Sequence, residues 1–476
     1  MKRFIEGKSR FQSTLFPETL EDFITEDNPV RVIEAFVEEL DLNKLEFKSV
    51  NPSATGRPAY HPSVLLKIYI YVYLNRVLST RRLEREAHRN IELMWLTDRL
   101  TPDFKTIADF RKNNGKAIQN VCREFVLLCR HLNLFAKAIV AIDGSKFKAV
   151  NNRDKNFTQA KMKRRIEEVE KSIERYLGKM DSVDQEEPDV TELKTTRINE
   201  KLESLQKEME RLRLLEAQLL DEPDKQISLT DPDSRSMKTR GIGIVGYNVQ
   251  TAVDTEHHLI VAHEVTNVGN DRNLLYTMSK QASSATGNEK LTIIADRGYY
   301  KYEQILDCHK AGFITYIPKS QTSGNQAKGL FGKKEFKYIP LEDVYSCPAG
   351  EKLIYRMTTE ERGHGIHRYW SSNCGSCSIK SQCTTSKERR VSRREREDVL
   401  DEMQARLDRE PDKMLTRKST VEHPFGTLKN WMGWTHFQTK TLKHVSTEMS
   451  LHVLSYNLKR VMNILGIKPL IQAIQA

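Results

Sequence analysis

The sequence predicts an α/β protein in which a mixed β-sheet is flanked by helices and preceded by a helical N-terminal region. Two short apolar runs, Ala138–Ile142 and Leu291–Ala295, carry this prediction. Each run is followed by an aspartate, Asp143 or Asp296, and then by a nearby glycine, which is typical of a buried strand that ends in a turn. Segments with helical periodicity lie before, between and after the two runs.

The composition indicates a globular, basic chain. Its 476 residues suggest roughly two to four domains. The net charge of +11 favours a polyanionic partner, most simply nucleic acid, although a basic protein without such a partner has the same charge. The first 16 residues lack the apolar core of a signal peptide, and Val64–Leu74 is too short to span a bilayer. Seven cysteines, an odd number, argue against a framework built only of disulfides and favour a reducing interior. We therefore expect a cytoplasmic, nucleoid-associated protein without a membrane partner.

Residues 1–130 are expected to form a helical, DNA-binding domain. Helices are predicted over Val30–Leu40, over Ser63–Leu78 after Pro62, from Ser79 or Thr80 onward, and from Thr101-Pro102 onward. The third of these helices repeats arginine every four residues, so that one face carries Arg81, Arg85 and Arg89. This face fits a helix-turn-helix DNA reader, and it fits a solvated helix face equally well.

Residues 158–227 are expected to form a helical hairpin inserted into the catalytic domain. Apolar residues recur at spacings of four and three from Met162 to Met180 and again from Ile198 to Leu212. The acidic stretch Asp181–Glu192 lies between them. The hairpin is predicted to be structural or to form dimers.

Residues 131–157 and 228–318 are expected to form the catalytic core. The segment Gly241–Gly246 matches the dinucleotide-binding pattern GxGxxG, but the residues before it are polar and Tyr247–Val253 is a predicted strand, so that function is rejected. The core is expected to continue with strands at His257–Val265 and Phe313–Pro318 and helices at Asn273–Ala285 and Tyr302–Lys310.

Residues 319–398 form a polar, Cys-rich insertion. It contains Cys374 and Cys377 in a tight CxxC turn, with Cys347 and Cys383 on either side. Four thiolates with this spacing can hold a structural Zn²⁺, and four free thiols are the alternative. Cys122, Cys129 and Cys308 are expected to be core residues. Residues 399–476 are predicted to be helices that complete the core, and they include helices at Pro411–Met432 and His444–Leu465.

A third acid, Glu422, lies in the helical stretch VEHPFGTLKNW. The three acidic motifs, IVAIDGSKFKA, IIADRGYY and this stretch, resemble those of bacterial insertion-sequence transposases with an RNase H-like DDE core. The chain resembles the group with the signature Tyr-x2-Arg-x3-Glu-x6-Lys, because Glu422 is followed by Lys429 at the right spacing. Lys418 stands at the arginine position beside Arg417, and Leu415 replaces the tyrosine.

The resemblance implies metal-dependent DNA cleavage at insertion-sequence ends followed by strand transfer. Two Mg²⁺ (or Mn²⁺) ions roughly 4 Å apart activate the attacking oxygen and stabilise the leaving oxygen in such reactions. Asp143 would bridge the ions, and Asp296 and Glu422 would each complete one site. Residues expected to contact DNA phosphates are Lys429, Lys418, Arg417, Arg297 and Lys146.

The implied partners are double-stranded DNA, as element ends and as target, and a second copy of the chain in a DNA-bound homodimer. One alternative is an RNase H-like nuclease that cuts without strand transfer. Another is an inactive, transposase-derived DNA-binding protein, against which the intact acids at all three positions argue.

Overall fold

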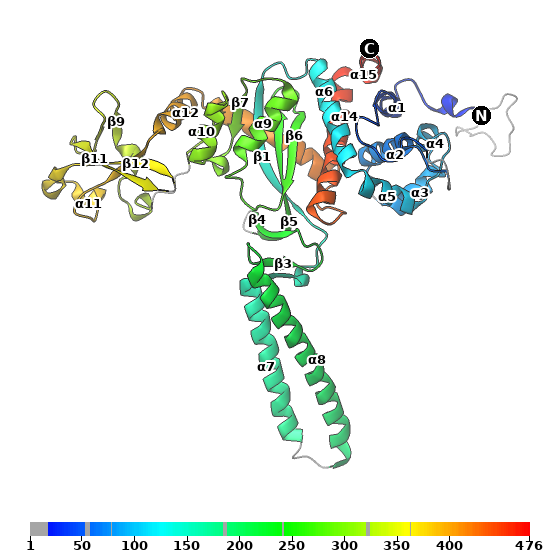
Figure 1. Ribbon diagram of the computed structural model, residues 1–476, viewed down its shortest axis with the longest axis horizontal. Coiled ribbons are helices and arrows are strands. Elements are labelled where there is room, and N and C mark those ends of the chain that lie inside the picture. The colour runs from blue at the N-terminus through cyan, green and yellow to red at the C-terminus, as the bar shows by residue number, and fades with distance from the viewer. Residues whose placement is uncertain are drawn as a thin grey trace, which may run out of the picture.

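The computed structural model describes residues 18–52, 58–77, 79–183, 188–239, 242–319, 324–361 and 363–476. A central body contains the main sheet. From it a long helical hairpin projects on one side, and a cysteine-containing β-subdomain and an N-terminal helical bundle lie at opposite ends (Figure 1).

The main sheet is mixed and runs in the order β4-β5-β1-β7-β8, with β6 also paired to β5. Strands β4, β5 and β6 extend the antiparallel side, whereas β7 and β8 are parallel to β1. This arrangement, with helices on the sheet, confirms the predicted α/β class and the RNase H-like core. The strands are β1 Ile139–Lys148, β4 Arg235–Thr239, β5 Ile242–Asp254, β6 Ile260–Thr266, β7 Thr292–Ala295 and β8 Ile314–Tyr316.

Strand β1 corrects one sequence expectation, because it does not end at Asp143 but continues through Gly144 to Lys148. Pairing with β5 extends it, since Gly144 lies opposite Gln250 and Lys148 opposite Gly246. The parallel pairing with β7 does end at Ile142, opposite Ala295. Asp143 therefore stands where β1 loses its neighbour on one side.

Strand β4 is a second correction, because no strand was expected before the GxGxxG segment. Its polar residues form an antiparallel pair with the start of β5, as an exposed edge strand permits. From Ile242 onward the glycine segment is itself part of β5, which agrees with rejecting a nucleotide-binding turn; Gly241 lies outside the described residues.

The N-terminal region is helical, as expected. Pro62 is the first residue of α2, and the imidazole of His61 caps that helix. The helix predicted after Thr101-Pro102 begins at Phe104, because Asp103 caps it. It ends at Asn113, so that Lys116, which the sequence places on the same helix, lies on the next one. The elements are η1 Leu20–Phe23, α1 Val30–Glu38, α2 Pro62–Asn75, α3 Thr80–Ala87, α4 Ile91–Leu96, α5 Phe104–Asn113 and α6 Gly115–His131.

The predicted hairpin consists of α7 (Gln159–Val183) and α8 (Pro188–Asp221), and a short sheet of β2 (Asn156–Thr158) and β3 (Gln226–Ser228) closes its base. The centre of its acidic connection, residues 184–187, lies outside the described residues. The predicted seam packs as a separate apolar core that contains Met162, Val169, Met209 and Leu212. Figure 1 shows both helices pointing away from the main sheet.

The Cys-rich insertion contains regular structure that its polar sequence did not predict. Five antiparallel strands in the order β13-β12-β11-β10-β9 enclose a small core of aromatic and aliphatic side chains. Its elements are η4 Gln326–Lys328, η5 Lys333–Glu335, β9 Lys337–Ile339, β10 Val344–Ser346, β11 Lys352–Glu361, β12 His364–Trp370, η6 Ser372–Ser376, α11 Lys380–Cys383 and β13 Val391–Arg394.

The remaining helices cover the sheet and link it to the N-terminal bundle. Helix α14 contacts α6, α2 and β6, and its buried residues join the bundle and the sheet in one hydrophobic core. No helix among the described residues is long and apolar enough to cross a membrane. These elements are α9 Leu275–Thr286, η3 Arg297–Tyr299, α10 Tyr302–Lys310, α12 Glu397–Arg409, α13 Asp412–Gly426, η7 Thr427–Trp431, α14 Leu442–Leu465 and α15 Ile467–Ile474.

Candidate active site

Asp143 lies in β1 opposite Thr251 of β5. Its carboxylate forms an ion pair with Arg417 of α13, with 2.7 Å between Oδ1 and Nη2. Burial raises the pKa of Asp143 to about 6; the Arg417 guanidinium opposes this shift, and the carboxylates of Asp296 and Asp271 add to it. The side chain is thus a partly buried acid whose negative charge is stabilised by a cation.

Asp296 follows β7 and caps the short helix η3, where its Oδ1 accepts a hydrogen bond of 2.8 Å from the Gly298 amide. Because Ile142 and Ala295 are partners in the parallel pair, the next residues, Asp143 and Asp296, lie next to each other where the β1–β7 pairing ends. Their electrostatic coupling agrees with this geometry. The structure therefore brings together the two acids that the strand-end patterns singled out.

Glu422 lies on α13, and its side chain is exposed. It borders a cavity of about 470 Å³ that is also lined by Trp431, Tyr456 and Arg460. Arg417, five residues earlier, faces Asp143, and five residues turn a helix by about 140°, so Glu422 points in a different direction. Across the described residues, no three His, Cys, Asp or Glu side chains are placed to share a metal ion. The role of Glu422 as third metal ligand stays a prediction.

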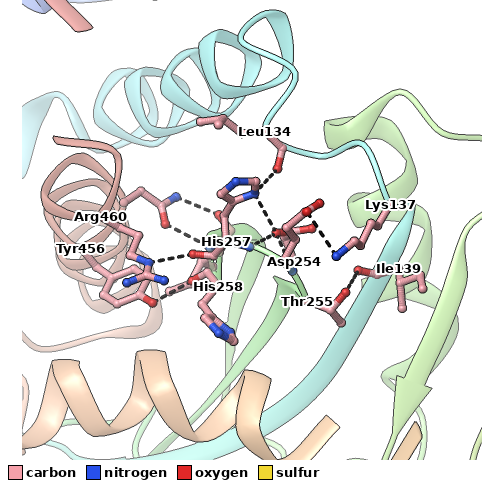
Figure 2. A network of polar contacts seen from close by, with 12 residues as sticks. Leu134, Lys137, Ile139, Asp254, Thr255, His257, His258, Tyr456 and Arg460 are labelled. Carbon is pink, nitrogen blue, oxygen red and sulfur yellow. Dashed lines mark hydrogen bonds and ion pairs between the residues drawn. The ribbon is translucent and has the colours of Figure 1, made fainter. Parts of the chain in front are cut away.

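The β5–β6 turn holds α14 and the beginning of β1, where Thr255 donates to the Ile139 carbonyl (Figure 2). The buried Asp254 carboxylate accepts hydrogen bonds from the backbone amides of Glu256 and His257. Tyr456 and Arg460 of α14 donate to the carbonyls of His258 and His257, each at 2.7 Å. The His258 ring also stacks on His423, the neighbour of Glu422, at 5.0 Å. This network anchors α13 and α14 on the sheet.

The predicted phosphate-binding residues are placed differently from one another. The Lys429 ammonium donates to Ser145 Oγ at 2.7 Å and to the Lys146 carbonyl at 3.0 Å, so it contacts β1 beside Asp143. Arg297, which follows Asp296, and Lys418, which follows Arg417, are both exposed, while the side chain of Lys146 is half-buried. Lys429 lies in η7, a π-helical turn that follows α13, rather than in a continuous α-helix with Glu422.

The arginine face of the N-terminal bundle is present in part. Arg81 and Arg85 are exposed on α3, and Arg81 stacks on Phe104 at 5.2 Å. Arg89 lies beyond the end of α3, because His88 is its C-cap, and it pairs with Glu86. Two of the three arginines thus share a helix face.

The four cysteines of the insertion gather around one cavity, which all of them line. Each is half-buried and outside any disulfide. Burial raises the pKa of Cys383, with further increases caused by Cys374, Cys347 and Cys377. Cys122, Cys129 and Cys308 are buried, as expected for core residues.

Two features of the site were missed by sequence reasoning. Two buried polar atoms beside Asp143, Thr251 Oγ1 and Arg417 Nε, have no hydrogen-bond partner among the described residues, nor does Thr420 Oγ1, one turn after Arg417 on α13. Asp271, in the loop between β6 and α9, is a further carboxylate close enough to raise the pKa of Asp143. The signal for Asp271 was indirect, because Asn248 and Gln250, to which it bonds, are polar residues at alternate positions of an otherwise apolar strand.

Two models of known protein families match parts of this chain. Residues 18–113 match the family described as Transposase domain (DUF772), and residues 224–458 match Transposase DDE domain. Among solved structures, the chain is similar to a piggyBac transposase in a synaptic complex with hairpin DNA. That match has 9% identity, covers 94% of this chain and 79% of that one, and has a TM-score of 0.34. No curated protein matches the chain.

Proposed function

For a chain that carries a transposase DDE domain behind an N-terminal transposase domain, we propose that the reaction is DNA cleavage at the ends of its own insertion sequence and transfer of the freed 3′-hydroxyls to target DNA. The observation that carries the proposal is the pair Asp143 and Asp296, which directly follow the last paired residues of the neighbouring parallel strands β1 and β7. A homodimer would hold the two element ends together.

The residues at this edge fit a divalent metal. Carboxylate oxygens are the ligands that Mg²⁺ prefers, and Mg²⁺ keeps several waters that need polar partners. Asp143 and Asp296 supply the carboxylates, and Thr251, the sheet partner of Asp143, has a buried Oγ1 without a hydrogen-bond partner among the described residues. When bound, the metal would activate the attacking oxygen and stabilise the leaving oxygen. Glu422 would have to turn toward the acids to join them as a third ligand.

The chain itself would bind and orient the DNA. Arg417 holds the Asp143 carboxylate, and Lys429 presents its ammonium beside β1, where a phosphate close to the two acids would meet it. Arg297, next to Asp296, and Lys418, next to Arg417, are exposed and would contact the DNA backbone. These contacts would hold the scissile phosphate over the carboxylates.

The test replaces each acid by its amide: Asp143→Asn, Asp296→Asn and Glu422→Gln. Each change removes a metal ligand with little change in volume, so cleavage should be lost while binding to end-containing DNA remains. Asp398→Asn, at an exposed position on α12, is the matched control and should cleave normally. A variant that cleaves at the wild-type rate removes that residue from the site.

A strand-transfer assay separates the proposal from the nuclease alternative. Pre-cleaved DNA with element ends and a 3′-hydroxyl should be joined to a target plasmid in the presence of Mg²⁺. Cleavage without any joined product would instead favour a nuclease.

We also propose that Zn²⁺ binds Cys347, Cys374, Cys377 and Cys383. The support is that these four half-buried thiols line one cavity beside the small core of the β-subdomain, against which Cys347 and Cys383 pack. No three of them are placed to share an ion among the described residues, so the thiols would have to move closer together to bind Zn²⁺. Metal analysis of protein purified without chelator should find about one zinc per chain, and the Cys374→Ser/Cys377→Ser variant should lose it. Zinc-free protein with seven titratable thiols after denaturation would refute the site.

A further inference from the structure

A buried polar cluster lies on β5 next to Asp143. Asn248 and Gln250 are fully buried, and in the sheet Gln250 is the direct partner of Gly144. Both side-chain amides donate to the same oxygen, Oδ1 of Asp271, at 2.8 Å and 2.7 Å. Asp271 thus fixes two side chains of the strand that pairs with β1.

The same cluster reaches the second acid. The hydroxyl of Tyr299, which is fully buried, donates to Gln250 Oε1. Tyr299 belongs to η3, the short helix that Asp296 caps, and its amide bonds to the carbonyl of Asp296 at 3.2 Å. A continuous chain of hydrogen bonds therefore runs from Asp271 through Gln250 and Tyr299 to the backbone of Asp296.

Gly144 provides the space for this cluster. A methyl group at this position would lie 2.3 Å from Gln250 Nε2, 2.7 Å from Asp271 Oδ1 and 3.1 Å from Asn248 Oδ1. Asn248 is fully buried, and its Oδ1 has no hydrogen-bond partner among the described residues. The cluster is thus packed directly against the backbone that follows Asp143, and an unsatisfied acceptor points at that backbone.

We propose that Asp271 is a positioning residue of the active site, which sets the separation of Asp143 and Asp296 through Gln250 and Tyr299. β1 and η3 carry the two acids, but backbone pairing between β1 and β7 ends at Ile142, one residue before Asp143. The side-chain cluster bridges the two elements beyond that point. The inference rests on the proposed function, because only in that function do Asp143 and Asp296 bind a metal ion.

The test measures Mn²⁺ affinity by titration calorimetry on the full chain without DNA, alongside cleavage. Tyr299→Phe removes only the hydroxyl, and Asp271→Ala removes the acceptor of both amides. Each should weaken Mn²⁺ binding by roughly 10-fold or more, the effect typical of lost partners behind metal ligands. Asp271→Asn keeps an oxygen that can accept both hydrogen bonds, so its affinity should lie closer to that of the wild type.

Tyr302→Phe is the matched control, since this tyrosine lies on the neighbouring helix α10 outside the cluster, and it should bind Mn²⁺ normally. Wild-type affinity in both Tyr299→Phe and Asp271→Ala would overturn the inference. If the wild type binds Mn²⁺ but cleaves no DNA, the proposed function fails while the affinities still decide the role of Asp271. A wild type that binds no Mn²⁺ overturns both.

Discussion

Replacing Gly144 by alanine tests the packing beside Asp143 most directly. The added methyl group would lie 2.3 Å and 2.7 Å from the polar atoms of Gln250 and Asp271, which is much shorter than van der Waals contact. Neither side chain can move without lengthening the hydrogen bonds that join them. We therefore expect the cluster to open, and its connection to η3 to loosen.

The cost can be worked from these contacts. Overpacking in a well-packed interior costs about 1–3 kcal/mol. Weakening a hydrogen bond to a charged acceptor costs up to about 1.5–3 kcal/mol, while replacing glycine within a strand returns about 0.5–1 kcal/mol. The net destabilisation of Gly144→Ala should be about 2–5 kcal/mol. Because the entropy of unfolding of a chain of this length is about 1 kcal/mol/K, the Tm should fall by about 2–5 °C.

Gly243→Ala is the control on β5, because a methyl group there would meet no atom within 4 Å. Thermal unfolding followed by circular dichroism should show a Tm equal to that of the wild type or slightly higher. In the Asp271→Ala background, Gly144→Ala should cost less than alone, since one of the two clashing groups is gone. Equal effects of the two glycine substitutions, or strict additivity with Asp271→Ala, would refute the packing argument.

Two further predictions concern the rest of the molecule. Burial lowers the pKa of His452 to about 4, from 6.5 in the unfolded chain, so the unfolded state takes up its proton first as the pH falls. The stability contributed by neutral His452 is therefore complete above about pH 6.5 and is lost toward pH 4, by up to about 3 kcal/mol. Urea unfolding at several pH values should show this fall in the free energy of unfolding, and His452→Gln should make the fall smaller. If the arginine face binds DNA, alanine at Arg81, Arg85 and Arg89 should weaken binding to element ends and lower the salt dependence by roughly one unit per lost phosphate contact. If affinity and its dependence on salt concentration are unchanged in a fluorescence anisotropy titration, these arginines form a solvated surface that does not bind DNA.

The local parts of the fold could be predicted from the sequence. Apolar runs that end in an aspartate identified Asp143 and Asp296, and heptad spacing identified the α7–α8 hairpin, because each signal lies within a short stretch of chain. The continuation of β1 beyond Asp143 could not be predicted, since it depends on pairing with β5, which is about 100 residues away in sequence. The five strands of the Cys-rich subdomain were missed because their few apolar residues are scattered among polar ones.

Asp271 shows why the site itself was only partly predictable. An aspartate in a polar loop is usually a turn or cap residue, and nothing in its own segment distinguishes it. It gains significance only when β5 pairs with β1 and thereby places the amides of Asn248 and Gln250 beneath Gly144. The alternation of polar residues along β5 was the available clue, and the sheet register was needed to interpret it.

The charges at this edge of the sheet explain why it suits a cation. The carboxylates of Asp271 and Asp296 both lie within electrostatic reach of Asp143, which forms an ion pair with Arg417. Burial raises the pKa of Asp143 despite the guanidinium beside it, and repulsion from the carboxylates of Asp296 and Asp271 raises it further. A divalent cation would relieve this repulsion more fully than a single arginine does. Thus the packing that raises the electrostatic energy of the carboxylates without a metal also favours metal binding. In the proposed role of Asp271, the cluster that joins β1 to η3 keeps Asp143 and Asp296 close together despite their repulsion.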